Sequence, residues 1–375
     1  MSSVCTAVSE FGWDLFKEIS KDGAQKNIFL SPFSISAALA MVAYGARGNT
    51  EAQIEKTTTD SQCDRPGGIH SQFRALLSQL NKPSSEYELS IANRLYGSMS
   101  FPFVQKFLHC IKELYHAELE SVDFKNKIEQ TREQINAWVA NKTHDKIKDL
   151  FPRGSLDHST VLVLVNAIYF KGQWSSRFKK ENTKEAPFRV NQNVSKNVPM
   201  MFQSGRFKYA AIQEPPLQLL ELPYVGKNLS MIILLPRDST GHEKLASFLT
   251  SKNIGEWLSS MYFQEVNVYL PKFKLEEKYY LKSTLASMGM TAPFEQRADL
   301  SGISEKQGLV VSRVIHQSFV EVNEEGTEAA AATGVGVKAT SAQIPVVVKA
   351  DVPFIFIIFH NVFKCPLFIG KYTSP

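Results

Sequence analysis

Residues 324–341 read Glu-Glu-Gly-Thr-Glu-Ala-Ala-Ala-Ala-Thr-Gly-Val-Gly-Val-Lys-Ala-Thr-Ser, after a β-like run at 319–322 and before an apolar C-terminal block. Counted with a period of two, one face carries only small or apolar side chains: Thr327, Ala329, Ala331, Thr333, Val335 and Val337. Because successive side chains of a strand point to opposite faces, this face can be buried in a sheet without burying a charge. Gly and Ala bury too little surface to fold alone, so the segment can equally stay outside the fold. We interpret it as a candidate conformational switch.

Two plainer interpretations compete with the switch. Four consecutive alanines at 329–332 favour a short helix, since Ala has the highest helix propensity. A Gly/Ala linker is the other alternative. Glycines at 326, 334 and 336 disfavour a long helix, and a core-forming block at 352–372 lies beyond the segment, which disfavours a linker.

The composition excludes several classes of protein. The length of 375 residues fits one large domain or two ordinary ones, and a hydrophobic fraction of 43% supports a sizeable core. The formal net charge is +5, but Lys and Arg are mixed with Asp and Glu along the whole chain and no run of five like charges exists, which disfavours a nucleic-acid partner. No apolar run reaches the roughly 18 residues that a membrane span needs.

The cysteines and the N-terminus indicate a compartment. Cys5, Cys63, Cys110 and Cys365 are scattered without CxxC spacing, so we expect reduced thiols and no disulfide framework. The first ten residues are too short and too polar for the core of a signal peptide. We therefore predict a cytoplasmic protein, with release that needs no signal peptide as a further route.

Helical patterns dominate the first half of the chain. Apolar residues recur every three or four positions from Val8 to Ile19, and Ser31-Pro32 is a helix start, with an end at Gly45. Similar spacing predicts further helices over 69–81 and 127–149.

Strand patterns dominate the second half. Continuous apolar runs at 160–170, 229–235 and 354–359 are typical of strands buried on both faces. Alternation over 262–275 predicts a hairpin. Helices early and strands late make an α+β protein.

Motifs for catalysis are absent from the sequence. It contains no HExxH, GxSxG, P-loop or GxGxxG pattern, and its eight histidines lack metal-ligand spacing. We interpret His316 as a hydrogen-bonded core histidine. Ser341 lies in a Gly/Ala segment that cannot hold a nucleophile and a base rigidly together. The sequence therefore predicts no enzyme, no cofactor and no metal.

The stretch Glu324–Gly334 resembles the reactive-loop hinge of the serpins, and the resemblance extends over essentially the whole chain. Further segments carry it: Asn27–Ser36 resembles the shutter, Leu164–Trp174 the third strand of the main sheet, and Ala298–Gly302 and Pro353–Phe356 also fit. The start on a helix without a signal peptide and the final Ser374-Pro375 are similar to the ovalbumin-like intracellular clade B, and within it to the epipin/headpin branch.

The resemblance implies a single domain over 1–375, with three β-sheets, eight or nine helices and an exposed reactive-centre loop at about 324–345. It also implies a suicide-substrate inhibitor. A protease attacks the loop, residues 326–339 insert into the main sheet, and the acyl-enzyme is carried about 40–45 Å, since each strand residue adds ~3.3 Å. The hinge residues are Gly326, Thr327, Glu328, Ala329, Ala330, Ala331, Ala332 and Thr333. The inward positions of the hinge, Thr327, Ala329, Ala331 and Thr333, carry no bulky or charged side chain, which favours an inhibitor over a non-inhibitory serpin with a binding or chaperone-like role.

Family spacing places the reactive bond at Thr340–Ser341, counted from Glu324. Thr340 is neither cationic nor aromatic, so Ala339 and Lys338 stay open as alternative P1 residues. Lys338 suits trypsin-like proteases, and Val337 would then precede it, which suits papain-like cysteine proteases. Serine and cysteine proteases both remain open as targets.

The resemblance also assigns supporting residues. Ser31, Ser34, Asn166 and His316 match the shutter that lets the central strands part. Trp174 matches the breach, where the loop first enters, and Lys272 with Glu324 matches an ion pair at the top of the sheet. The expected partner is a protease bound covalently to a monomer. Heparin is not expected, because only Arg74 and Lys82 are cationic near the helix at 69–81.

Overall fold

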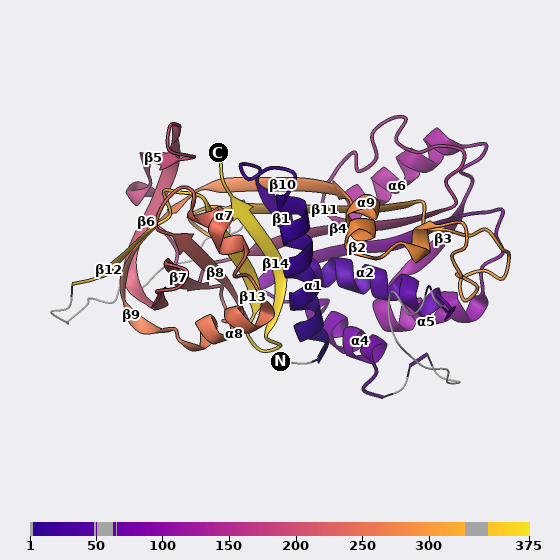
Figure 1. Ribbon diagram of the computed structural model, residues 1–375, viewed down its shortest axis with the longest axis horizontal. Coiled ribbons are helices and arrows are strands. Elements are labelled where there is room, and N and C mark those ends of the chain that lie inside the picture. Colours follow the sequence, from indigo (N-terminus) through magenta and orange to yellow (C-terminus); the bar gives the residue numbers. More distant parts are fainter. Residues whose placement is uncertain (1–2, 49, 51–62, 65, 327–343) are drawn as a thin grey trace.

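The computed structural model describes residues 3–48, 50, 63, 64, 66–326 and 344–375, and it is elongated, with two sheets meeting near its middle (Figure 1). The smaller sheet has the strand order β10-β11-β4-β2-β3. Its strands are β10 (Phe273–Tyr280), β11 (Arg313–Val322), β4 (Leu162–Gly172), β2 (Tyr87–Ser98) and β3 (Glu118–Val122). At its centre β11 and β4 run parallel, whereas β10 and β2 are antiparallel to them on either side.

Helices cover both faces of the smaller sheet. Val163, Val165 and Ala167 of β4 pack in one apolar cluster with helix α6 (Ile128–Lys142), whereas Leu164 and Ile168 pack in the main core with helix α2 (Pro32–Gly45). Alternate residues of β4 therefore face opposite layers, as the period of a strand requires. This explains why β4 is apolar along its length, as predicted for a strand buried on both faces.

The larger sheet has nine strands, in the order β1-β14-β13-β8-β7-β6-β9-β12 with β5 beside β6. Its 18-residue strand β6 pairs with β5 and β9 over most of its length and with β7 at its end. It thereby links one group of strands (β5, β9 and β12) to a second group (β7, β8, β13, β14 and β1) in one hydrogen-bonded network. The three sheets that the resemblance implies correspond to the smaller sheet and these two linked groups. The bounds are β1 (Ile28–Leu30), β5 (Lys184–Arg189), β6 (Ser195–Ile212), β7 (Leu217–Pro223), β8 (Leu229–Pro236), β9 (Tyr262–Pro271), β12 (Val346–Lys349), β13 (Phe354–His360) and β14 (Cys365–Tyr372).

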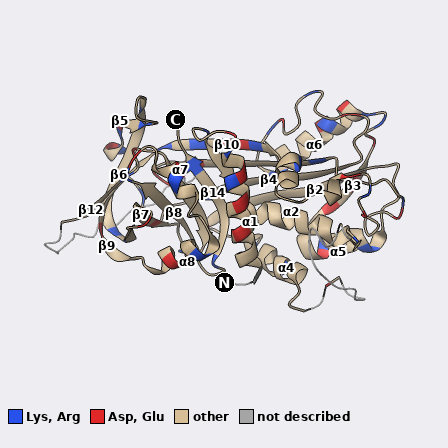
Figure 2. Cartoon of the chain, viewed as in Figure 1, with Lys and Arg blue, Asp and Glu red and all other residues tan. Residues whose placement is uncertain are grey.

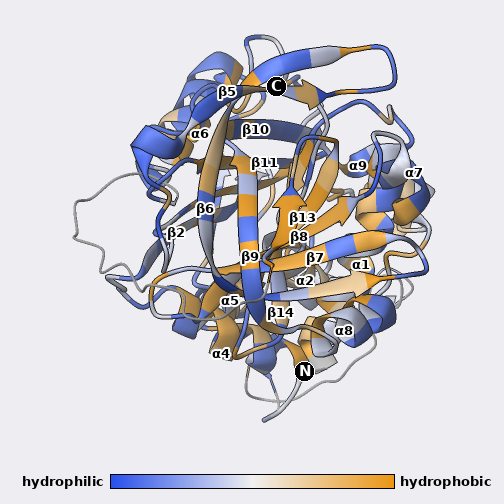
Figure 3. Ribbon diagram, turned by 90° about the vertical axis from the view of Figure 1, so that its left-hand side faces the viewer, coloured by the Kyte–Doolittle hydropathy of each residue, from blue (hydrophilic) through white to orange (hydrophobic). Residues whose placement is uncertain are grey.

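Burial separates the strands of the larger sheet. The strands β8 and β13 are buried at every residue, whereas β9 alternates and turns one face to solvent (Figure 3). The other helices are α1 (Ser3–Ser20), α4 (Ile69–Leu80), α5 (Gln105–Tyr115), α7 (Gly241–Ala246), α8 (Ser251–Ser259) and α9 (Lys282–Ser287), with short 3-10 turns η1 (Lys180–Asn182) and η2 (Ala292–Phe294). Charges of both signs are scattered over the surface (Figure 2). None of the described helices is long and apolar enough to cross a membrane.

Several predicted elements are confirmed. The helix start at Ser31-Pro32 is real, because the Ser31 side chain accepts a hydrogen bond from the Ser34 N–H and α2 ends at Gly45. The α+β class is confirmed by the eight α-helices and two sheets of the described part.

Other predicted elements are wrong. The helix expected over 127–149 ends at Lys142, because His144 and Asp145 adopt left-handed backbone with φ of 50° and 60°. The hairpin expected over 262–275 does not form. The strand β9 pairs with β6 and β12, whereas β10 pairs with β11 in the other sheet.

The four cysteines form two disulfides, which corrects the expectation of reduced thiols. Cys5 of α1 bonds to Cys365 of β14 with a Cα–Cα distance of 4.9 Å, and Cys63 bonds to Cys110 of α5 at 5.3 Å. The first pair is 360 residues apart in the chain. Helix α1 packs against β14, so the fold brings together cysteines that spacing alone could not pair.

Candidate functional site

The seam between β11 and β4 is the centre of the candidate site. Seven residue pairs join the two strands, from Arg313 opposite Val163 to Phe319 opposite Tyr169. Both strands run three residues further, to Val322 and Gly172, but this register stops at Phe319. The pairing therefore ends just before the chain leaves β11 toward residues 327–343, which lie outside the described residues.

A tight turn closes the end of the seam. The Asn323 N–H donates to the Gly326 carbonyl at 2.8 Å, and the Gly326 N–H donates back to the Asn323 carbonyl at 3.2 Å. Gly326 also forms an antiparallel bridge with Gln173, just beyond β4. Its φ is +126°, and a Cβ added there would lie 2.2 Å from the Gly172 carbonyl oxygen. Only glycine fits this position, because both the backbone angle and the space exclude a side chain.

Trp174 lies under this turn. Its indole N–H donates to the Asn323 carbonyl at 2.9 Å, and its backbone N–H donates to the Glu325 carbonyl at 3.0 Å. The ring stacks on Tyr224 with centroids 4.7 Å apart and planes at 11°. Tyr224 is completely buried, which raises the pKa of its hydroxyl. The two stacked rings form the apolar surface beneath the turn.

Two acidic residues of the turn are held by cations. Glu324 accepts from Lys272 Nζ at 3.0 Å and from the Thr183 hydroxyl at 2.8 Å, and Lys180 of η1 lies 3.1 Å from Glu325. Burial raises the pKa of the Glu324 carboxyl, but hydrogen bonds from its own backbone N–H, Lys272 and Thr183 outweigh burial and leave the pKa below its usual value. Glu324 is therefore an anion at neutral pH, and the turn is tied to the segment that precedes β5.

A second polar cluster crosses the middle of the seam. The Asn166 amide of β4 donates to the Ser34 hydroxyl at 2.6 Å, and its carbonyl oxygen lies 2.5 Å from His316 Nδ1 of β11. The Ser31 N–H donates to His316 Nε2 at 3.2 Å, and the Ser31 hydroxyl donates to the Leu367 carbonyl at 2.7 Å. All four side chains are buried. The cluster thus joins α2, both central strands and β14.

The contacts of His316 define its protonation. Because Nε2 accepts from a backbone N–H, the proton of the neutral ring is on Nδ1, where it is donated to Asn166. Complete burial lowers the pKa of His316 to about 3. The ring is therefore neutral and serves as a structural link across the seam, as predicted for a core histidine.

The structure thus brings the predicted supporting residues into two clusters along one seam. Ser31, Ser34, Asn166 and His316 meet at its middle, and Trp174, Lys272 and Glu324 meet at its end. The hinge residues 327–333 and the reactive-bond residues Lys338, Ala339, Thr340 and Ser341 lie outside the described residues.

Sequence reasoning missed several members of the clusters. Tyr224, Thr183 and Asn323 belong to the end of the seam, and Ser318 donates to the Phe29 carbonyl at 2.5 Å beside the middle cluster. No local pattern marks these residues, since each meets its partners only through the fold. Among the described residues, no group of three or more His, Cys, Asp or Glu side chains is placed to hold a metal ion.

Comparisons with known proteins agree with this geometry. The family model described as Serpin (serine protease inhibitor) matches residues 6–375. Human Serpin B11 is 47% identical, with 100% of both chains covered, and the leukocyte elastase inhibitor of Equus caballus is also 47% identical with 100% of both covered. The solved structure of uncleaved ovalbumin superposes with a TM-score of 0.91 at 39% identity and covers 100% of both chains.

Proposed function

Because this chain belongs to the serpin family, we propose that it inhibits proteases as a suicide substrate through a reactive-centre loop at about 324–345. The serpin fold and the resemblance to clade B are confirmed by its full-length relatives and by ovalbumin. In the proposed mechanism a protease cleaves near Thr340–Ser341, and residues 326–339 then insert between β11 and β4. The acyl-enzyme is trapped as the loop carries it away.

The observation that carries this proposal is the direct parallel pairing of β11 and β4. A chain that turns at 323–326 and runs back along β11 is antiparallel to β11, and therefore also antiparallel to β4. Insertion replaces one parallel ladder of seven residue pairs by two antiparallel ladders, which are slightly more stable per residue. At ~1 kcal/mol net for each added hydrogen bond, the gain is on the order of ten kcal/mol.

The two clusters oppose this gain in the uncut protein. Insertion separates β4 from β11, so the contact between Asn166 and His316 must break. It also lifts the turn off Trp174 and withdraws Glu324 and Glu325 from Lys272 and Lys180. We infer that these contacts hold the sheet closed until the loop is cut.

The residues near the proposed reactive bond suggest which classes of protease to test as targets. Small residues at 339–341 suit a shallow pocket, and one relative is named as an inhibitor of leukocyte elastase, so elastase-like proteases belong in the panel. Lys338 adds trypsin-like proteases, and Val337 adds papain-like ones. The proposal includes a monomer built as one domain over 1–375, placed in the cytoplasm or released without a signal peptide. The two disulfides favour the released form, because disulfides persist in oxidising compartments.

The test is incubation of the full chain with this panel, followed by denaturing electrophoresis. We expect a covalent band with one protease class and a higher melting temperature of the cleaved chain. The matched control is Ala331→Arg, which places a cation on the inward face and should convert the inhibitor into a substrate that is cleaved without a covalent band. Clean cleavage of the unsubstituted chain by every protease, with no gain in melting temperature, would overturn the proposal and favour a non-inhibitory binding role.

A further inference from the structure

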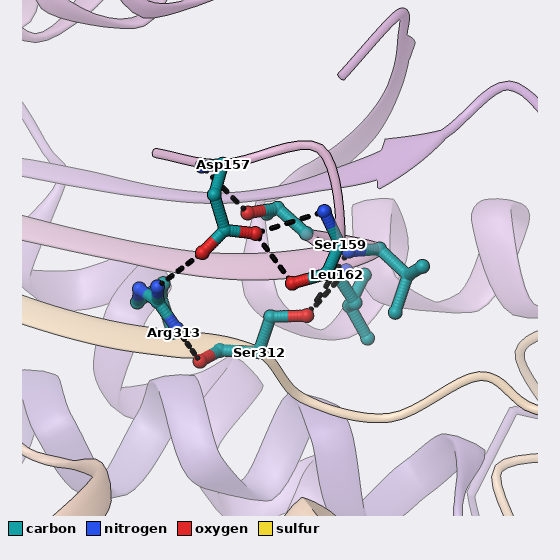
Figure 4. A network of polar contacts seen from close by, with 7 residues as sticks. Asp157, Ser159, Leu162, Ser312 and Arg313 are labelled. Atoms are coloured by element: carbon teal, nitrogen blue, oxygen red, sulfur yellow. Dashed lines mark hydrogen bonds and ion pairs between the residues drawn. The ribbon is translucent and has the colours of Figure 1, made fainter. Parts of the chain in front are cut away.

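A polar network closes the seam at the end opposite the turn (Figure 4). It joins Ser312 and Arg313, where β11 begins, to residues 157–162, which lead into β4. Neither the shutter nor the breach includes these residues. Arg313 is six residues and Ser312 seven residues before Phe319, where the seam stops at its upper end.

Several contacts of this network cross the seam. Arg313 Nη2 lies 3.0 Å from Asp157 Oδ2, the Ser312 N–H donates to the Leu162 carbonyl at 2.8 Å, and the Ser312 hydroxyl accepts from the Val161 N–H at 3.0 Å. These contacts come in addition to the strand pairing that starts at Arg313.

The Asp157 side chain is fixed in place by its own neighbours. Its other oxygen accepts from the Ser159 N–H at 2.8 Å and from the Ser159 hydroxyl. These bonds, with Arg313, keep the pKa of Asp157 below its usual value. On the opposite side, Arg313 Nη1 donates to the Ser312 carbonyl at 3.0 Å. Hydrogen bonds other than the ion pair therefore hold both the Asp157 and the Arg313 side chain in place.

The strand register shows when an inserting loop would reach this network. In an antiparallel ladder, each step down one strand is matched by one step along the other. The turn pairs Asn323 with Gly326, so ten steps below Asn323 is Arg313, and ten steps beyond Gly326 is residue 336. Residues 327–335 can insert beside 314–322 without disturbing Arg313, whereas residues 336 and 337 come level with Arg313 and Ser312.

Insertion past residue 335 is incompatible with the network. Neighbouring strands lie about 4.8 Å apart, so a strand between them places β4 and β11 roughly 9.6 Å apart. The hydrogen bonds that join Ser312 to the backbone of Val161 and Leu162, at 3.0 and 2.8 Å, cannot span that separation. An inserted strand would also lie between Arg313 and Asp157, whose ion pair at 3.0 Å joins the two sides directly. The network is therefore opened at the last stage of insertion, and at no earlier stage.

We propose that Asp157, Ser312 and Arg313 form a terminal lock that controls the completion of loop insertion and leaves its start unaffected. The lock rests on the proposed insertion between β11 and β4. Partial insertion of the uncut loop meets only the breach and the shutter. Full insertion after cleavage also opens the lock, so the lock sets how fast the last residues of the loop, and the protease joined to them, reach the far end of the sheet.

Synthetic peptides test the lock without a target protease. Peptides of residues 326–335 and 326–339 are annealed to the full uncut chain, and 1:1 binding is followed by native electrophoresis and mass spectrometry. The shorter peptide ends level with Val314, whereas the longer one passes Arg313. The variants are Asp157→Asn and Arg313→Gln, and the control is Arg297→Gln. This control removes the exposed ion pair between Arg297 and Glu295 at 2.7 Å, and neither residue belongs to β4, β11 or residues 157–162.

We expect the longer peptide to anneal about two- to five-fold faster to Asp157→Asn and Arg313→Gln, the effect of an ion pair worth up to ~1 kcal/mol. The shorter peptide should anneal at the unsubstituted rate to all variants, and Arg297→Gln should change neither rate. Equal acceleration of both peptides would overturn the lock, because the variants would then loosen the whole sheet. Unchanged rates for both peptides would also overturn it.

The outcomes separate the lock from the proposed function. Failure of both peptides to anneal to any variant would overturn insertion and the lock together. Selective acceleration of the longer peptide, with no covalent complex in the protease panel, would support the lock and reject inhibition. If Asp157→Asn fails to fold, as judged by its melting curve, Ser312→Ala takes its place, because it removes the hydroxyl that accepts from Val161.

Discussion

Acidification should weaken the seam through His316. In the native chain Nδ1 carries the proton and Nε2 accepts from the Ser31 N–H at 3.2 Å, so a proton added at Nε2 would face another donor. Burial lowers the native pKa to about 3 from 6.5. Below pH 6.5 the unfolded chain therefore takes up a proton that the folded chain refuses, and stability falls as the pH falls. The contribution of this group is complete above pH 6.5 and is lost progressively toward pH 3.

The expected loss of folding stability follows from the lowered pKa of His316. At ~1.36 kcal/mol per pH unit, lowering the pH from 7 to 5 costs about 2 kcal/mol through this histidine alone. The assay compares urea unfolding of the unsubstituted chain and His316→Gln at pH 7 and pH 5. The variant is less stable at pH 7, but it should lose about 2 kcal/mol less on acidification.

Other buried histidines do not obscure the comparison. Burial also lowers the pKa of His242, and it lowers that of His360 to about 4, but both contribute equally to the two proteins. The control His109→Gln changes an exposed histidine of α5 outside the seam and should keep the full pH dependence. An identical loss in His316→Gln and the unsubstituted chain would refute the assignment of a neutral, buried link across the seam.

Three further predictions concern the turn and the termini. Lys272→Ala leaves the buried Glu324 carboxylate without its ion pair at 3.0 Å, so urea unfolding should show that the uncut chain is about 1–3 kcal/mol less stable. The double variant Lys272→Ala with Glu324→Gln should recover part of this stability, whereas a Lys272→Ala variant as stable as the parent would contradict the role of the pair. Gly326→Ala places a Cβ 2.2 Å from a carbonyl oxygen at φ +126°, so it should destabilise the turn by about 1–3 kcal/mol and speed heat-induced loop insertion on native gels, whereas an unchanged rate would show that the turn does not restrain the loop. After cleavage of the loop, the Cys5–Cys365 disulfide should keep the C-terminal fragment attached on denaturing gels until a reductant is added. The variant Cys5→Ser should release this fragment without reductant, and the same release from the unsubstituted chain would disprove the disulfide.

Sequence patterns succeeded where the signal is local. The Ser31-Pro32 start of α2 depends on a cap and a fixed φ, and the continuous apolar run of β4 reflects burial on both faces. Strand β2 was missed, although the alternation of Tyr87-Glu-Leu-Ser-Ile91 is the local signal of a half-buried strand. The predicted hairpin over 262–275 failed for another reason: alternation identifies strands, but pairing partners are decided by the rest of the chain.

Some residues of the candidate site could be identified from the sequence, and others only from the structure. Trp174 and Glu324 were identified through a family resemblance, and the structure places them within one cluster. Tyr224 is an ordinary buried aromatic in the sequence, and only its stacking on Trp174 marks it. The Cys5–Cys365 pair was equally invisible, because no spacing rule connects the first helix to a C-terminal strand.

The proposed need for cleavage follows from where the two ends of the loop are fixed. Residue 336 inserted beside Arg313 would lie about 33 Å along the seam from Gly326, at ~3.3 Å for each of ten steps. The other end is fixed at Val346, which pairs with Val266 of β9. Val266 lies six residues before Lys272, the partner of Glu324, so Val346 lies on the order of 20 Å beyond the turn.

The chain between residue 336 and Val346 spans at most about 36 Å when fully extended. Nearly all of that length is used in returning along the seam to the turn, and too little remains to reach β12. Full insertion of an uncut loop must therefore pull β12 off β9, whereas cleavage near Thr340–Ser341 removes this restraint at once. In the proposed mechanism, the parallel pairing of β12 with β9 therefore helps to hold back full insertion until a protease cuts the chain.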